Sequence, residues 1–73
     1  MRNIKCDKLT EREREIVFYM INGKSKTEIA EILRLSVSTV KTHVENIYGK
    51  FGVHGKVELV VYVMKNDIIK MFE

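Results

Sequence analysis

Side chains that can make hydrogen bonds recur at helical spacing between residues 36 and 53. At about 100° per residue, the apolar positions share one arc of such a helix: Val37, Val40, Val44, Ile47 and Phe51. The polar positions share another arc: Ser38, Lys41, Thr42, Glu45 and Gly49. The apolar arc is predicted to be buried and the polar arc to be presented. A cation, an anion and hydroxyls on one face suit the edges of DNA bases better than a merely solvated surface, so we expect this helix to read DNA.

The length of 73 residues limits the chain to one domain with a modest core. No apolar run approaches the roughly 20 residues of a membrane span, and the first eight residues lack the apolar stretch of a signal peptide. We therefore expect a soluble, intracellular protein that does not contact membranes. The single Cys6 has no His or Cys partner at metal-ligand spacing, so we predict a reduced thiol, no metal and no cofactor.

The positive charge lies in the middle of the chain. Residues 24–56 carry six Lys or Arg and three Glu. Their net charge of +3 equals that of the whole chain. A basic middle suits a polyanionic partner such as double-stranded DNA, although small soluble domains also reach this balance by chance.

Three N-cap signals predict three helices. Thr10 followed by Glu13 has the spacing of a capping box and predicts a helix that ends near Gly23. Ser25 followed by Glu28 repeats the signal and predicts a short helix to about Arg34, whose apolar residues are Ile29, Ala30, Ile32 and Leu33. Ser36 is the next N-cap, and the tight connection before it gives a helix-turn-helix outline.

A fourth helix is predicted after the left-handed cap at Gly52, from Lys56 to about Asn66. Its β-branched residues would suit a strand equally well on propensity, and we expect tertiary context to favour the helix. The predicted fold class is therefore all-α with four helices. Residues 1–8 form a short N-terminal arm, and residues 9–73 form the domain.

Residues 9–66 resemble the LuxR-type helix-turn-helix domain, also called the NarL/FixJ effector domain. The resemblance rests on LTEREREIV at Leu9–Val17, GKSKTEIA at Gly23–Ala30 and LSVSTVKTHVENIYGKFGV at Leu35–Val53. Members of this family are four-helix DNA-binding domains of bacterial transcription regulators, which act in the cytoplasm. They bind as dimers to two half-sites and place the third helix in the major groove. The resemblance implies the same for this chain.

The resemblance makes Lys41, Thr42 and Glu45 the candidates for base contact, and Ser38 shares their face. Lys41 could donate to guanine, the methyl group of Thr42 could meet a thymine methyl, and Glu45 could accept from cytosine N4. Glu45 has an alternative role as an intrahelical partner that orients Lys41, four residues earlier. Gly49 either allows close approach to DNA or is simply tolerated.

Candidate phosphate contacts lie at two helix starts and along the third helix. The start of the second helix offers Lys24, Ser25 and Lys26, and the third helix offers Ser36, Thr39, His43 and Lys50. His43 could instead be a packed residue with a hydrogen bond. The chain departs from the family at Lys26, because the family has Asn then Lys where this chain has Lys26 then Thr27. It also has Lys56 where the family more often has Arg, which supplies a planar fork of donors.

The fourth helix is apolar over roughly 200° of its circumference, about twice the width that one core contact needs. We predict a homodimer through Val57, Val60, Val61 and Met64. The alternative is that the segment after it, with Ile68, Ile69, Met71 and Phe72, folds back and covers this surface.

Other function classes have weaker support. The sequence has no paired carboxylates on a presented face, no nucleophile beside a base and no phosphate-binding glycine loop, which argues against an enzyme. Only eight residues precede the predicted domain, so we expect no sensor domain that binds a small molecule, and we expect the chain to be either a stand-alone regulator or an excised effector domain. The competing interpretation is a helix-turn-helix module that binds RNA polymerase, as regions of sigma factors do.

Overall fold

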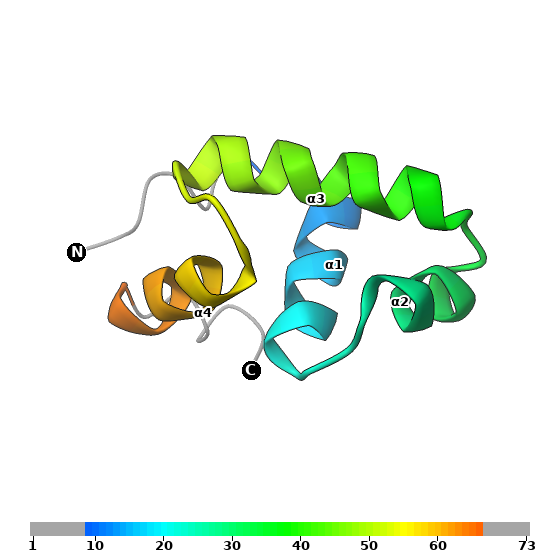
Figure 1. Ribbon diagram of the computed structural model, residues 1–73, viewed down its shortest axis with the longest axis horizontal. Helices are drawn as coiled ribbons and strands as arrows, with labels where there is room; N and C mark the ends of the chain where they lie inside the picture. Colours follow the sequence, from blue (N-terminus) through cyan, green and yellow to red (C-terminus); the bar gives the residue numbers. More distant parts are fainter. Residues whose placement is uncertain (1–8, 67–73) are drawn as a thin grey trace.

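The computed structural model describes residues 9–66, which form four helices and no strand (Figure 1). They are α1 (Glu11–Ile21), α2 (Lys26–Leu33), α3 (Val37–Phe51) and α4 (Lys56–Lys65). The predicted all-α class and the number of helices are confirmed. The predicted N-terminal arm with Cys6, and the segment 67–73 proposed to fold back on the fourth helix, lie outside the described residues.

The first three helices begin where the N-cap signals predict. The Thr10 hydroxyl accepts from the Glu13 amide at 3.1 Å, and the Glu13 carboxylate accepts from the Thr10 amide at 2.9 Å. Ser25 and Glu28 repeat this capping box at 3.1 and 2.8 Å. Ser36 caps α3 by accepting from the Thr39 amide at 3.1 Å. These bonds satisfy amides that have no partner inside the helix, so local sequence is enough to set each start.

Left-handed residues end two helices. Gly52 follows α3 with φ of 70°, as predicted. Arg34 follows α2 with φ of 60°, a conformation that costs a residue with a Cβ roughly 1–2 kcal/mol. The Leu35 amide then donates to the Ala30 carbonyl at 2.9 Å, which closes the turn. Only Leu35 separates this cap from the N-cap Ser36, so the turn fixes how α2 and α3 cross.

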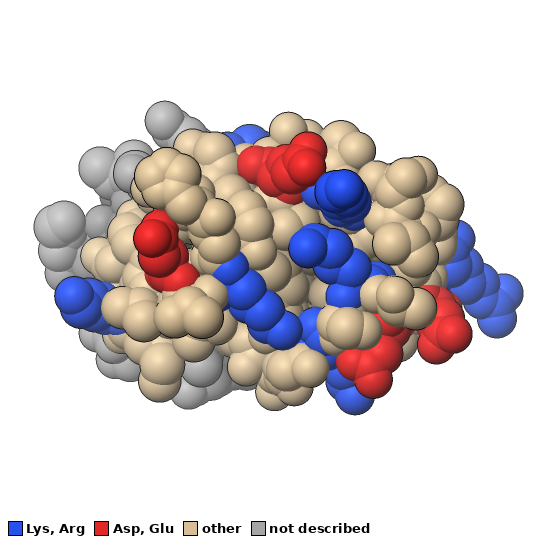
Figure 2. Space-filling model, viewed as in Figure 1, with Lys and Arg blue, Asp and Glu red and all other residues tan. Residues whose placement is uncertain are grey.

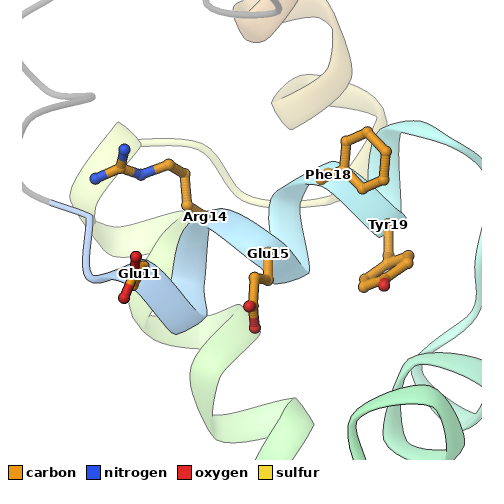
Figure 3. Close-up of a pocket in the computed structure, with 5 residues that line it drawn as sticks. All are labelled: Glu11, Arg14, Glu15, Phe18 and Tyr19. Atoms are coloured by element: carbon orange, nitrogen blue, oxygen red, sulfur yellow. The ribbon is translucent and has the colours of Figure 1, made fainter. Parts of the chain in front are cut away.

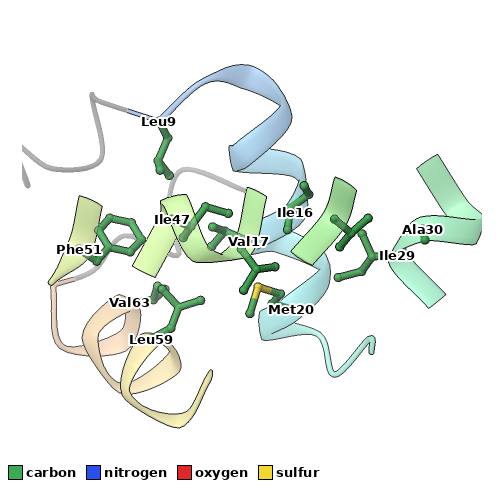
Figure 4. Close-up of a cluster of buried hydrophobic side chains, with 12 residues drawn as sticks. Leu9, Ile16, Val17, Met20, Ile29, Ala30, Ile47, Phe51, Leu59 and Val63 are labelled. Atoms are coloured by element: carbon green, nitrogen blue, oxygen red, sulfur yellow. The ribbon is translucent and has the colours of Figure 1, made fainter. Parts of the chain in front are cut away.

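The core lies where α3 crosses α1, with α2 packed beside them at one end and α4 at the other (Figures 1 and 4). Its members are Leu9, which precedes the N-cap of α1, and apolar side chains from all four helices: Ile16, Val17, Met20, Ile29, Ala30, Val40, Val44, Ile47, Phe51, Leu59 and Val63. Phe51 also packs against the Tyr62 ring, with ring centroids 5.0 Å apart. Burying each large apolar side chain contributes about 1.5–3 kcal/mol, so α3 is held mainly by its apolar arc.

Two apolar residues depart from the pattern. Val37 was predicted to be buried with the other valines of α3, and this is wrong, because 46% of its surface is exposed. Ile32 of α2 is 45% exposed, although Ile29 and Ala30 of the same helix are buried. Val37 is the first residue of α3, where the helix extends beyond α1 (Figure 1), so α1 does not cover it. No helix among residues 9–66 has the length and apolar character to cross a membrane.

Candidate nucleic-acid interface

The polar arc of α3 is exposed along the whole helix. Ser38, Lys41, Thr42 and Glu45 are all exposed, and the opposite arc from Val40 to Phe51 is buried. Gly49 lies on the exposed arc, and a Cβ added there would meet no atom within 4 Å. The structure therefore brings the four predicted base-contact residues to one face and shows that nothing in the described chain requires the glycine.

Hydroxyl groups at the start of α3 bond to one another. The Ser36 hydroxyl donates to the Thr39 hydroxyl at 2.8 Å and lies 3.2 Å from the Ser38 hydroxyl. The Thr42 hydroxyl donates to the Ser38 carbonyl oxygen at 3.1 Å, as threonines in helices often do. Because the hydroxyl proton of Thr42 is used within the helix, this side chain offers a partner its methyl group and the acceptor lone pairs of its hydroxyl oxygen.

Lysines from three parts of the chain meet at a shallow hollow beside the start of α2. The hollow is lined by Met20, Lys24, Ser25, Lys26, Tyr48 and Lys56. The Lys56 ammonium lies there because it donates to the Lys24 carbonyl oxygen at 3.4 Å. Figure 2 shows Lys and Arg side chains gathered on the same part of the surface, between α2 and α4 and below α3. We call Lys24, Ser25, Lys26 and Lys56 the lysine hollow.

Sequence reasoning placed Lys24, Ser25 and Lys26 together but gave Lys56 no part in this site. Lys56 lies 32 residues from its hydrogen-bond partner Lys24, and no local spacing links them. Tyr48 was also missed. Burial raises the pKa of its phenol above the ordinary value of 10.0, so it stays a neutral donor at the edge of the hollow.

A carboxylate moderates the charge of the lysine hollow. The hydrogen bond from the Ser25 amide, helped by the charges of Lys24 and Lys56, lowers the pKa of Glu28 below its ordinary value of 4.5. Glu28 is therefore ionised at neutral pH and occupies the Ser25 amide. The amides of Lys26 and Thr27 belong to the first turn of α2 and have no acceptor inside the helix, so they are the backbone donors that face an incoming anion.

One buried carboxylate links α1 to α3. Glu13 is 4% exposed, and its Oε1 accepts from the Lys50 ammonium at 2.7 Å. Burial by itself would raise the pKa of Glu13, but the hydrogen bonds from Lys50 and the Thr10 amide and the charges of Lys50 and His43 outweigh it, and the pKa is lowered. Sequence reasoning saw Glu13 only as a helix cap. The phosphate contact of Lys50 stays a prediction, and the structure adds an intramolecular role for this residue.

The remaining predicted phosphate residues lie on the surface of α3. Ser36 and Thr39 are exposed at its start, and His43 is half-buried on the side of Glu13. Within residues 9–66, no group of His, Cys, Asp or Glu has the arrangement to hold a metal ion.

The apolar residues of α4 fall into a buried group and an exposed group. Leu59 and Val63 are fully buried in the core. Val57, Val61 and Met64 are 77%, 45% and 64% exposed, and Val60 is half-buried. Part of the apolar surface of α4 is thus left uncovered by residues 9–66.

A second hollow lies along α1 and contains none of the predicted site residues (Figure 3). It is lined by Glu11, Arg14, Glu15, Phe18 and Tyr19, and the rings of Phe18 and Tyr19 meet edge to face at 5.5 Å. Two carboxylates against one guanidinium do not suit a polyanion. The basic surface and the exposed arc of α3 are the better candidate interface.

The model of the family described as bacterial regulatory proteins, luxR family, matches residues 7–63. This chain belongs to the LuxR family. The match includes the helix-turn-helix of α2 and α3, and the family consists of DNA-binding regulators.

Curated relatives agree with this assignment. The LuxR-family chain is 46% identical over 61 residues to the Fimbriae Z protein of Escherichia coli, covering 84% of this chain and 29% of that protein. It is 40% identical over 62 residues to the response regulator protein VraR of Staphylococcus aureus, covering 85% of this chain and 30% of that protein. The chain therefore spans less than a third of the length of these relatives.

Proposed function

We propose that this LuxR-family domain binds double-stranded DNA in a sequence-specific manner and regulates transcription, with α3 in the major groove. The observation that carries the proposal is the division of α3 into a buried apolar arc and an exposed polar arc, beside a hollow lined by three lysines. Because the apolar arc is packed in the core, α3 keeps one orientation about its axis and its polar arc faces outward.

Within the groove, each side chain of the exposed arc has a distinct role. Lys41 donates to guanine O6 or N7, Thr42 places its methyl group against thymine, and Glu45 accepts from cytosine N4. Ser38 lies between them on the same arc. Glu45 also lies one turn after Lys41, a spacing at which its charge attracts the ammonium.

Phosphate contacts position this helix on the duplex. The lysine hollow and the amides of Lys26 and Thr27 bind one phosphate, and the start of the recognition helix offers Ser36 and Thr39 to another. His43 and Lys50 follow Thr39 by four and eleven residues, so they lie on the same side of the helix and contact the DNA backbone there. Lys56 belongs to the proposed set because it shares the hollow with Lys24.

We further propose that two copies pair through α4. The exposed Val57, Val61 and Met64 with the half-buried Val60 form a continuous apolar face on that helix. A two-fold dimer would bury this face and place two α3 helices on half-sites about one helical turn apart. Because its target is chromosomal DNA, such a regulator works in the bacterial cytoplasm.

Selection of bound duplexes from a random pool tests the proposal. We expect a two-half-site motif, and an affinity that falls with salt by a slope of roughly −0.9 per neutralised phosphate. Equal and weak binding to all duplexes, together with tight binding to RNA polymerase, would overturn sequence-specific DNA binding and favour the polymerase-binding module.

Thr42 provides a residue-level test of the reading face. Thr42→Ser keeps the hydroxyl that bonds to Ser38 and removes the methyl group, whereas Thr42→Val keeps a methyl group and removes the hydroxyl. We expect Thr42→Ser to lose preference at one base position, worth about 1 kcal/mol for one methyl contact, and Thr42→Val to retain it. Selected motifs measure this directly, and an unchanged motif for Thr42→Ser would remove Thr42 from the readers.

A further inference from the structure

The first residue of α3 is an exposed valine on the side of the helix that presents Lys41. Val37 is 46% exposed, and Lys41 follows it by four residues, so both lie on one line along the helix about 6 Å apart. Val37 and Thr42 are about 140° apart, with Lys41, Glu45 and Ser38 between them. Val37 therefore forms one border of the exposed arc and Thr42 forms the other.

Val37 is the exposed apolar side chain in the first turn of α3, and its neighbours Ser36, Ser38 and Thr39 carry hydroxyls. The hydroxyls of Ser36, Ser38 and Thr39 bond to one another, and that of Thr42 bonds to the backbone. The first turn of α3 contains no acidic residue, so no side-chain carboxylate in that turn repels an approaching DNA strand. In the major groove, the apolar group on a base edge is the C5-methyl of thymine.

We infer that Val37 is a second methyl reader, which packs against the C5-methyl of a thymine at the end of the half-site nearest the start of α3. This inference rests on the proposed function, because it requires α3 to lie in the major groove. Contact between the two apolar groups removes from water the part of Val37 that the folded domain leaves exposed. It also extends the recognised sequence by a position that Lys41, Thr42 and Glu45 do not contact.

Replacing thymine by deoxyuridine removes this methyl group and changes no hydrogen bond on the base edge. The experiment uses the full chain and the duplex selected by it, with each thymine replaced in turn. For the unmodified chain, we expect one thymine near the outer end of the half-site at which deoxyuridine weakens binding roughly fourfold, the value for one buried carbon. Val37→Ala should bind the thymine duplex roughly fourfold more weakly or worse and should lose no further affinity with deoxyuridine at that position.

Ile32→Ala is the matched control, because Ile32 is an equally exposed apolar residue on α2. It should respond to deoxyuridine as the unmodified chain does. Thermal unfolding of Val37→Ala should match that of the unmodified chain, since Val37 is half exposed and alanine has a higher helix propensity than valine.

The outcomes separate this inference from the proposed function. A chain that selects a motif but shows the same deoxyuridine sensitivity with Val37→Ala overturns the role of Val37 and leaves the proposed function standing. A selected motif in which the only methyl-sensitive thymine is the one assigned to Thr42 also overturns the role of Val37 and leaves the proposed function standing. A chain that selects no motif overturns both.

Discussion

Glu13 joins two helices through one carboxylate. Its Oε1 completes the capping box of α1 and accepts from Lys50 in the last turn of α3. Because α3 carries the exposed polar arc, this buried bond helps to set the orientation of that arc. At the scale of single residues, one carboxylate oxygen therefore both caps α1 and joins α1 to α3.

Glu13→Gln should lower the free energy of unfolding by about 1–2 kcal/mol at neutral pH, because a hydrogen bond between two charged groups is lost. The pKa of Glu13 is lowered in the folded chain, so its contribution is fully present above the unfolded value near 4.5 and is lost as the pH falls through the lower folded value. The stability difference between the variants should therefore shrink below about pH 4.5. Urea unfolding from pH 7 to pH 3 measures it.

Glu28→Gln is the control for this prediction, because Glu28 makes the same capping box on α2 but is exposed. We expect it to lose less stability than Glu13→Gln at neutral pH. Equal losses for the two variants would show that the capping box alone accounts for Glu13 and that the bond to Lys50 adds nothing.

At the scale of elements, the start of α4 completes a site that begins at α2. Lys56 stands in the first turn of α4 and reaches the Lys24 carbonyl, so the two helices and the α1–α2 turn share one basic hollow. The cation that the family pattern places after an Asn is shifted to Lys26 here. Lys56 lines the same hollow, where it lacks the donor fork of the arginine that the family more often has at this position.

Lys56→Ala should weaken DNA binding to a similar extent for all sequences and reduce the salt slope by about 1, because one phosphate contact is lost. Lys65→Ala is the matched control, since Lys65 lies in the last turn of the same helix. Binding titrations at several salt concentrations measure both variants. An unchanged slope for Lys56→Ala, or an equal change for Lys65→Ala, would contradict a phosphate contact at the hollow.

At the scale of the whole molecule, residues 9–66 leave an apolar face of α4 uncovered on one side and expose the polar arc of α3 on another. Val61 lies in that face and is 45% exposed, so a charge there should leave the fold intact and disrupt pairing. Val61→Glu should sediment as a monomer at micromolar concentration, where the unmodified chain should sediment as a dimer on DNA. It should also lose the preference for two half-sites.

Ile32→Glu places the same charge on an equally exposed residue of α2 and should not change the sedimentation. A monomer for the unmodified chain, with and without a two-half-site duplex, would contradict the dimer.

The sequence by itself determined the elements, because helix starts and ends depend on near neighbours. Thr10, Ser25 and Ser36 cap helices through residues three positions away, and Gly52 adopts the left-handed conformation that its missing Cβ allows. From Val40 onward, the helical periodicity also predicted correctly which side of α3 is buried and which side is exposed. Only the tertiary structure decided what depends on distant segments: the exposure of Val37, the bond of Glu13 to Lys50, and the entry of Lys56 into the hollow of Lys24. These contacts join residues up to 37 positions apart, and the way the helices cross, which no local spacing encodes, brings them together.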